Sequence, residues 1–169
     1  AVGVSGGRDS MCLLHAVVNC GAIDVSDILA VHVNHCLRET ADADQAFVKR
    51  FCENNGIAFR AFRVDVLKAC AENKLTVEQA ARDLRYDVFG SLVKSGEIDV
   101  VFTAHHALDN AESVLMHLFR GAGLDGLCGI AASDGERRLA RPLISVLPSE
   151  LDEYVTINRL SYVTDDTNF

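Results

Sequence analysis

The segment Ser5-Gly6-Gly7-Arg8-Asp9-Ser10 joins the short apolar run Val2-Gly3-Val4 to a longer apolar run from Met11 to Val18. This order predicts a strand, a glycine turn and the start of a helix. Such a turn brings backbone N–H groups, serine hydroxyls and the positive end of the helix dipole to one point. We therefore predict an anion-binding loop with phosphate as its ligand. The alternative is an ordinary turn in which Asp9 or Ser10 caps the helix.

The residues inside this segment restrict the kind of phosphate loop. A Walker loop needs a lysine after its last glycine, and none lies between Gly7 and Ser10. Asp9 adds a carboxylate beside the expected phosphate, and the two negative groups repel each other unless Mg²⁺ lies between them. The segment therefore predicts a phosphate loop of another kind, with Mg²⁺ at Asp9.

Composition limits what can be built around this loop. The chain has 169 residues, 49% of them hydrophobic, which is enough for one domain with a sizeable core. Because 16 basic residues face 24 acidic ones, giving a net charge of −8, a broad basic surface for nucleic acid is excluded. No apolar stretch reaches membrane-spanning length, so we expect a cytoplasmic protein without membrane contact. The six cysteines form no C-x-x-C pair, and we expect free thiols.

Strand-like and helix-like segments alternate along the chain. After the first strand and helix, strands are expected at 28–33, 58–64 and 99–103, and helices at 43–51, 77–92 and 109–119. Thr76 with Gln79 has the form of a capping box before the most regular of these helices. The pattern predicts an α/β fold: an open parallel sheet with helices on both faces.

In such folds ligands bind at the carboxyl ends of the strands. This rule selects residues 5–10, 32–38 and 105–112, together with Asp65. The run from Gly121 to Gly126 has the G-x-G-x-x-G spacing of a dinucleotide loop, but it follows a predicted helix rather than a strand. We interpret it as a flexible turn.

With these stretches in view, Ser5–Ser10 resembles the signature of the PP-loop ATPases, which share an adenine-nucleotide alpha-hydrolase-like fold and cleave ATP to AMP and pyrophosphate. The closest resemblance within them is to the lysidine synthetase branch. It covers nearly the whole chain, and the matching stretches occur in the family's order: Val31–Arg38, Glu78 with Ala81-Arg82 and Arg85-Tyr86, Thr103–His106, Asp109–Ser113, Arg120–Gly123, Gly126–Gly129, Arg141–Leu143 and Asp165–Asn168.

The resemblance implies a two-step reaction on the wobble cytidine of an isoleucine tRNA. ATP first adenylates the 2-carbonyl oxygen of the base, and an amine of free L-lysine then displaces AMP to form lysidine. The implied cofactors are ATP and Mg²⁺, and the implied partners are isoleucine tRNA, through its anticodon region, and free L-lysine. Whether the chain forms a homodimer is left open.

The resemblance also implies roles for individual residues. The residues expected to hold the nucleotide are Ser5, Gly6, Gly7, Arg8 and Ser10 at the pyrophosphate, Asp9 at Mg²⁺, and His32 and Asn34 at the adenosine. The residues expected to act on the other substrates are Asp109 and Glu112 at the lysine ammonium groups, Arg85 at the lysine carboxylate or a phosphate, and His105 at the activated base or a phosphate.

Simpler readings stand beside these roles. Asp109 and Glu112 lie three residues apart on one helix face and could serve only the helix dipole. For one of His105 and His106, a packed side chain is as good an explanation as a contact with the base or a phosphate. Glu78 and Arg82, four residues apart, are expected to form an exposed ion pair. The last basic residues, Arg120, Arg137, Arg138 and Arg141, are either tRNA contacts or solvated side chains.

The chain departs from the family at Leu108, where lysidine synthetases usually have a second acid. We expect residues 1–169 to form the PP-loop catalytic domain, with further tRNA-binding segments in the family's longer members. Two other functions stay open. One is another PP-loop reaction, by a tRNA thiolase or an amidating ATP pyrophosphatase, and the thiolase is weakened because the cysteines are unpaired. The other is a nucleotide-binding domain without ligase activity.

Overall fold

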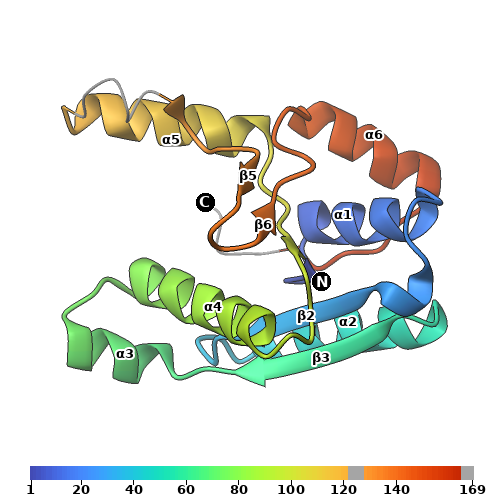
Figure 1. The fold of residues 1–169 in the computed structure, drawn as a ribbon, viewed down its shortest axis with the longest axis horizontal. Helices are drawn as coiled ribbons and strands as arrows, with labels where there is room; N and C mark the ends of the chain where they lie inside the picture. Colours follow the sequence, from blue (N-terminus) through green and yellow to red (C-terminus); the bar gives the residue numbers. More distant parts are fainter. Residues whose placement is uncertain (122–127, 165–169) are drawn as a thin grey trace.

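The computed structural model describes residues 1–121 and 128–164 and contains one six-stranded sheet in the order β3-β2-β1-β4-β6-β5 (Figure 1). The strands are β1 (Val2–Gly3), β2 (Leu29–Asn34), β3 (Ala58–Arg63), β4 (Val101–Phe102), β5 (Ser133–Asp134) and β6 (Leu139–Ala140). All neighbouring pairs are parallel except β5 with β6. The predicted parallel α/β fold is confirmed, and one antiparallel strand is added at its edge.

The helices alternate with the strands as the sequence predicts, and two more are present. They are α1 (Arg8–Asn19), α2 (Ala41–Asn54), α3 (Val66–Asn73), α4 (Val77–Lys94), α5 (Ala107–Phe119) and α6 (Pro148–Asn158), with a short 3₁₀ turn η1 (Val25–Asp27). Sequence patterns did not predict α3, α6 or the β5–β6 hairpin. No helix among the described residues is long and apolar enough to span a membrane.

Both faces of the sheet are covered, because alternate residues of β2 face opposite sides. Ala30 packs into a core with α1 and α2, whereas Val31 packs into a second core with Phe89 and Leu92 of α4. Helices α2 and α4 accordingly lie on opposite sides of β2 (Figure 1). His32 and Asn34 have the same parity as Ala30 and therefore lie on the α1 and α2 side.

The start of α4 differs in one detail from the predicted capping box. The Thr76 hydroxyl accepts a hydrogen bond from the Gln79 backbone N–H at 3.2 Å, as expected. The Gln79 side chain, however, donates to Asp83 at 2.7 Å instead of reaching back to the cap. Only half of the capping box therefore forms, because an acid one turn further along the helix gives the amide a nearer partner.

Helix α5 lies at the rim of the molecule, apart from the sheet (Figure 1). None of its residues is buried, and several large apolar side chains are exposed on it: Leu108, Leu115, Met116, Leu118 and Phe119. Its first turn is held to the rest of the fold, since the Ala107 N–H donates to Val146. The helix therefore brings its N-terminus, rather than a packed face, to the ends of the strands.

Candidate functional site

A cavity of about 840 Å³ opens at the carboxyl ends of β1, β2 and β4. Its walls come from residues 3–5 and 7–10, from residues 31–38 with Ala41 and Asp44, from residues 103–105 with Asp109, from Arg85 and Phe89 of α4, and from residues 162–164. This position is the one that the strand-end rule predicts. The cavity brings together stretches that are far apart in the sequence, and Asp65 is not among its lining residues.

The phosphate loop is closed around the hydroxyl of Ser10. That oxygen accepts hydrogen bonds from the N–H groups of Ser5 and Gly6, each at 3.2 Å, and donates to the carbonyl of Gly7 at 2.9 Å. The Gly7 N–H in turn donates to the Ser5 hydroxyl at 3.3 Å. Gly6 has φ +100°, a conformation that glycine adopts without strain. The loop therefore directs its donors to two hydroxyl oxygens 3.1 Å apart, which occupy the position expected for anion oxygens.

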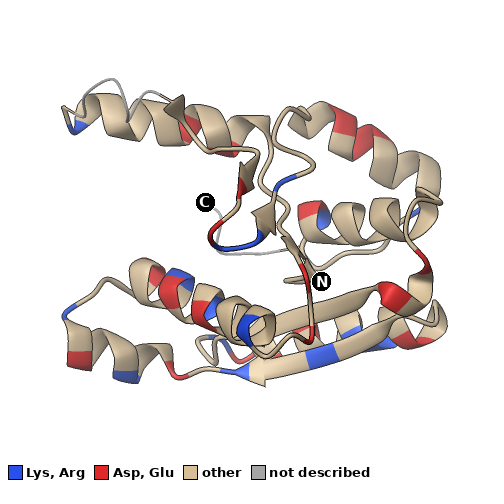
Figure 2. Cartoon of the chain, viewed as in Figure 1, with Lys and Arg blue, Asp and Glu red and all other residues tan. Residues whose placement is uncertain are grey.

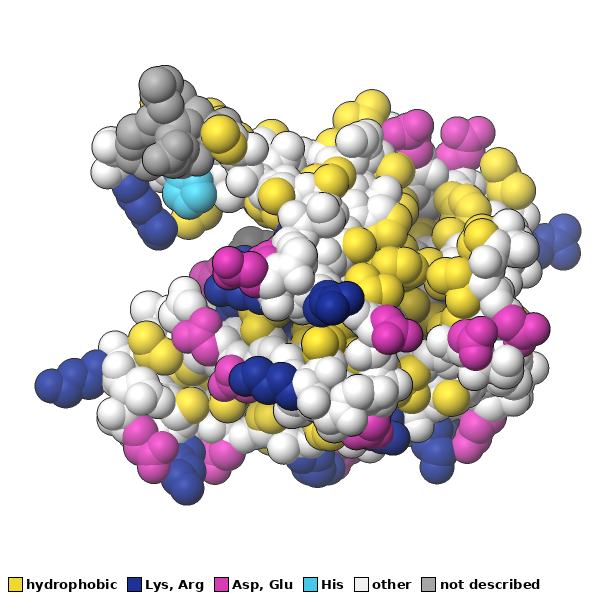
Figure 3. Space-filling model, viewed as in Figure 1, with side chains coloured by type: hydrophobic (Ala, Val, Ile, Leu, Met, Phe, Trp, Pro, Cys, Tyr) yellow, Lys and Arg dark blue, Asp and Glu magenta, His cyan; other side chains and the backbone are white. Residues whose placement is uncertain are grey.

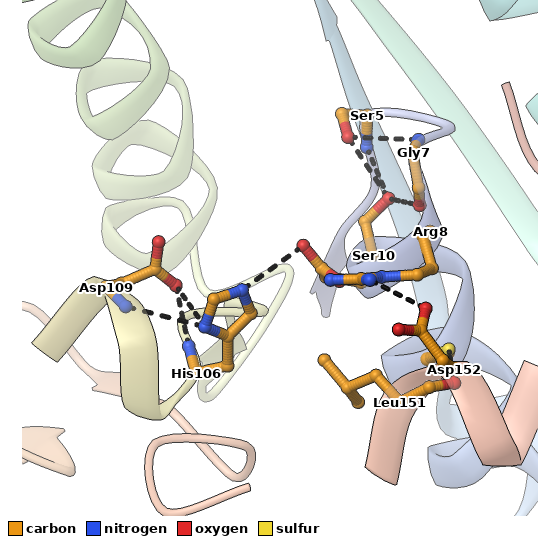
Figure 4. A network of polar contacts seen from close by, with 10 residues as sticks. Ser5, Gly7, Arg8, Ser10, His106, Asp109, Leu151 and Asp152 are labelled. Carbon is orange, nitrogen blue, oxygen red and sulfur yellow. Dashed lines mark hydrogen bonds and ion pairs between the residues drawn. The ribbon is translucent and has the colours of Figure 1, made fainter. Parts of the chain in front are cut away.

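Arg8 lies beside this loop but is bound by acids of the chain itself. Its Nε is 2.7 Å from Oδ1 of Asp9, and its Nη1 is 2.7 Å from Oδ1 of Asp152 on α6 (Figure 4). In this arrangement the guanidinium holds the Asp9 carboxylate in place and ties α1 to α6. The expected contact of Arg8 with a nucleotide stays a prediction.

His106 connects the loop with the start of α5. Its backbone N–H donates to Oδ2 of Asp109 at 2.7 Å, and its Nδ1 accepts from the Asp109 backbone N–H at 3.4 Å. Nδ1 also lies 3.3 Å from Oδ2 of Asp109, and Nε2 faces Oδ2 of Asp9 at 3.6 Å. Figure 4 shows the imidazole between the two segments. One buried side chain thus caps α5 and contacts the phosphate loop.

This role of His106 was not found from the sequence, which left His105 and His106 undecided. The signal was present, because His106 precedes Asp109 by three residues at the start of a predicted helix, the spacing of a capping box. Histidine is not among the residues preferred at helix N-caps, so this spacing alone does not predict the cap.

His105 lies on the cavity side of the same turn. Its Nδ1 is 3.0 Å from the hydroxyl of Thr103. Burial, followed by the positive charges of Arg85 and Arg141, lowers the pKa of His105 to about 4. The imidazole is therefore neutral near pH 7, and His105 lines the cavity.

His32 and Asn34 both line the cavity but are already engaged within the chain. Nδ1 of buried His32 lies 2.8 Å from the carbonyl oxygen of Val4, to which it donates. The Asn34 amide donates to Oδ1 of Asp42 at 2.9 Å and accepts from the Cys36 N–H at 2.9 Å. Asn34 thereby fastens the loop after β2 to the start of α2. The expected adenosine contacts of both residues stay predictions.

The two acids expected at lysine are separated by the structure. Asp109 lines the cavity, whereas Glu112 is exposed one turn further along α5 and is not among the lining residues. Leu108, at the position where the family usually has an acid, is 49% exposed and does not line the cavity either. Asp109 is therefore the acid of this pair that can reach a ligand held at the phosphate loop.

Arg85 reaches the cavity from α4. It is more than half buried, and its Nε has no hydrogen-bond partner among the described residues. Burial lowers the pKa of Arg85 from its usual value, although a guanidinium stays charged near pH 7. A buried cation without an anion is costly, so this side chain is suited to an anionic ligand. The sequence motifs at residues 122–127 and 165–168 lie outside the described residues.

With the loop, the cavity and the sheet established, the class of the domain is defined: the chain belongs to the PP-loop domain family, whose profile matches residues 1–169. Two curated relatives are the tRNA(Ile)-lysidine synthases of Petrotoga mobilis and Clostridium acetobutylicum. They are 39% identical over 168 residues and 40% identical over 169 residues, in each case across 99% of this chain. The matches cover 53% and 36% of those relatives, so the chain spans about a third to a half of their length.

Solved structures share the fold at lower sequence identity. The U34-tRNA thiolase NcsA from Methanococcus maripaludis, solved with its [4Fe-4S] cluster, matches with a TM-score of 0.79 at 19% identity, over 99% of this chain and 59% of its own. The NH3-dependent NAD synthetase from Campylobacter jejuni matches with a TM-score of 0.62 at 15% identity, over 94% of this chain and 63% of its own. At these identities the likeness concerns the fold alone.

Proposed function

We propose that the chain is the PP-loop domain of an enzyme that joins lysine to the wobble cytidine of an isoleucine tRNA and releases pyrophosphate and AMP. Support comes from the relatives, which are named for this activity and match 99% of the chain. The observation that carries the proposal is that a single cavity joins the phosphate loop, neutral His105 and the carboxylate of Asp109.

In the first step the 2-carbonyl oxygen of the cytidine attacks the α-phosphorus of ATP, and pyrophosphate leaves. The N–H groups of Ser5, Gly6 and Gly7 point to two neighbouring hydroxyl oxygens of the loop and can bind the leaving oxygens in their place. The loop thus supplies the positioning and charge stabilisation that phosphoryl and nucleotidyl transfer require.

We assign to Asp9 the magnesium ion that this step would use, because its carboxylate lines the cavity beside the loop. Its Oδ1 is held by Arg8, and its Oδ2 faces His106 at the loop. No group of three or more metal-binding side chains occurs among residues 1–121 and 128–164. One carboxylate together with substrate phosphates and water is the usual set of magnesium ligands. When bound, the ion would neutralise charge on the leaving pyrophosphate.

In the second step an amine of lysine attacks C2 of the adenylated base, and AMP leaves. We assign the binding of a lysine ammonium group to Asp109, because its carboxylate lines the cavity. Arg85 balances the carboxylate of lysine or a phosphate. His105 contributes a neutral ring at the cavity wall that can hydrogen bond to the base. These steps are expected in the cytoplasm, where ATP, lysine and tRNA are available.

Other PP-loop reactions have less support. A thiolase with an iron–sulfur cluster would need several cysteines together, and the described residues contain no group of three possible metal ligands. Buried Cys12 and Cys52 and exposed Cys20 and Cys36 are free thiols. Nucleotide binding without ligation remains the third candidate, because Leu108 leaves the start of α5 with one acid fewer than the family usually has.

The test is incubation of the protein with ATP, Mg²⁺, labelled lysine and isoleucine tRNA. We expect lysine incorporation together with release of AMP, and neither product with a tRNA whose wobble cytidine is replaced by uridine. Release of AMP without lysine uptake would indicate another PP-loop reaction. Binding of ATP without release of AMP under any of these conditions would support the nucleotide-binding candidate.

A further inference from the structure

We propose that Arg82, Arg85 and Arg137, arranged around the ring of Tyr86, bind the phosphate backbone of the RNA substrate beside the cavity. We call these three arginines the arginine cluster. The inference rests on the proposed function for the identity of the ligand. It concerns how RNA is held, which the phosphate loop and Asp109 do not explain.

The cluster is assembled from two parts of the chain. The guanidinium carbons of Arg82 and Arg85 on α4 lie over the Tyr86 ring at 5.2 and 5.5 Å from its centroid. Arg137, in the turn between β5 and β6, lies over the same ring at 5.8 Å. Figure 2 shows basic residues on α4 and on this hairpin turn. Tyr86 therefore joins three positive charges from elements that are distant in the sequence.

These charges are largely unbalanced within the chain. Among the described residues the cluster makes one ion pair, between Nε of Arg137 and Oδ2 of Asp134 at 3.9 Å. Arg82 stacks on Tyr86 instead of forming the ion pair with Glu78 that the sequence predicted. The chain carries a net charge of −8, so three arginines gathered with one paired carboxylate among the described residues are not a general property of its surface.

One member of the cluster is a buried cation without an anion beside it. Nε of Arg85 is buried and has no hydrogen-bond partner among the described residues. The Arg85 side chain lines the cavity, where a ligand can reach it. A buried cation without an anion is costly unless a ligand balances its charge. The arrangement therefore indicates an anion.

The position of the cluster favours a polymer over a small anion. Arg85 lines the cavity, whereas Arg82 and Arg137 are exposed outside its lining. Figure 3 shows a notch in the surface between the region of α5 and that of α4. A single carboxylate or phosphate would bind inside the cavity only. A nucleic-acid strand has successive phosphates, which can contact Arg85 in the cavity and the exposed arginines outside it. Arginines stacked on a ring still present N–H groups at their edges for phosphate oxygens.

The test measures binding of an RNA hairpin with the anticodon stem-loop of an isoleucine tRNA over a series of salt concentrations. For the double variant Arg82→Gln with Arg137→Gln, we expect the slope of log affinity against log salt to fall by about one per lost phosphate contact. The matched control is Arg50→Gln, which removes an exposed arginine of α2 and should leave the slope unchanged. Unchanged affinity for a fluorescent ATP analogue shows that the variants are folded.

Equal slopes for the double variant, the control and the wild type would overturn the proposal. So would a raised KM for lysine with an unchanged RNA slope, which would assign the cluster to a small anion. The two proposals fail separately. If the double variant has a smaller salt slope but the wild-type protein incorporates no lysine, the RNA-binding role of the cluster is supported and the ligase function is not. If the wild-type protein incorporates lysine but the double variant keeps the wild-type salt slope, the ligase function is supported and the role of the cluster is not.

Discussion

Nε2 of His106 lies 3.6 Å from Oδ2 of Asp9, so the imidazole that caps α5 also faces the carboxylate of the phosphate loop (Figure 4). One buried side chain therefore links two parts of the proposed site. These are the loop, where the base would be activated, and Asp109, where lysine would bind. A change at His106 should affect both helix capping and catalysis, and the two effects can be separated.

Replacing His106 tests this separation. His106→Ala removes the cap of α5 and should lower the free energy of unfolding by about 1 kcal/mol. His106→Asn supplies another N-cap acceptor and should restore that stability, but it is too short to reach Asp9. Because the loop carboxylate is then less well positioned, we expect AMP formation to fall roughly ten- to hundred-fold in both variants. Urea denaturation and an AMP assay give the two quantities. Wild-type AMP formation in the His106→Asn variant would contradict the coupling.

The two glycines of the phosphate loop should respond differently to a methyl group. Gly6 has φ +100°, so Gly6→Ala should cost about 1–2 kcal/mol of stability and distort the loop. Gly7 has φ −70°, and an added Cβ would lie 3.5 Å from the Ser5 hydroxyl, which is an ordinary contact. Gly7→Ala should therefore change stability by less than about 0.5 kcal/mol. Urea denaturation of both variants measures this difference, and similar losses would refute the strain argument.

The acids of α5 should differ in their effect on lysine. Asp109→Asn keeps an oxygen that can accept from the His106 N–H, so the capping interaction survives while the charge is lost. We expect the KM for lysine to rise at least about ten-fold, as for the loss of one charge-assisted hydrogen bond. Glu112→Gln, outside the cavity, should change it by less than about two-fold. Steady-state kinetics at saturating ATP and tRNA decide the matter, and a larger effect at Glu112 would reverse the assignment.

Acid should destabilise the fold through His105. Its pKa is about 4 in the folded state and near 6.5 in an unfolded chain, so above pH 6.5 the ring is neutral in both states. Between pH 6.5 and 4 the unfolded chain binds a proton that the folded chain excludes, and stability falls as the pH falls. His105→Gln should reduce this slope in urea denaturation measured across the interval. The pKa values of His32 and His35 are also lowered, so some dependence of stability on pH should remain in the variant. If stability of the variant depends on pH as strongly as that of the wild type, His105 does not contribute.

Local sequence predicted the elements whose periodicity is undisturbed. Long helices such as α4 and the buried strand β2 were placed close to their observed bounds, because their apolar residues recur at one fixed spacing. The hairpin β5–β6 was missed because each of its strands has only two residues, too few for alternation to show. Helix α6 was missed because its apolar residues do not gather on one face, and a single residue of the helix, Leu151, is buried.

The sequence by itself determined the parallel α/β fold, the phosphate loop at residues 5–10 and the gathering of site residues at the strand ends. These follow from hydrophobic period, glycine conformation and the direction of parallel strands, which are local properties of the chain. Only the tertiary structure decided that His106 rather than His105 faces Asp9, that Glu112 lies outside the cavity, and that Arg137 meets Arg82 and Arg85 on Tyr86. Such relationships depend on how separate elements pack in space, and no spacing along the chain encodes them.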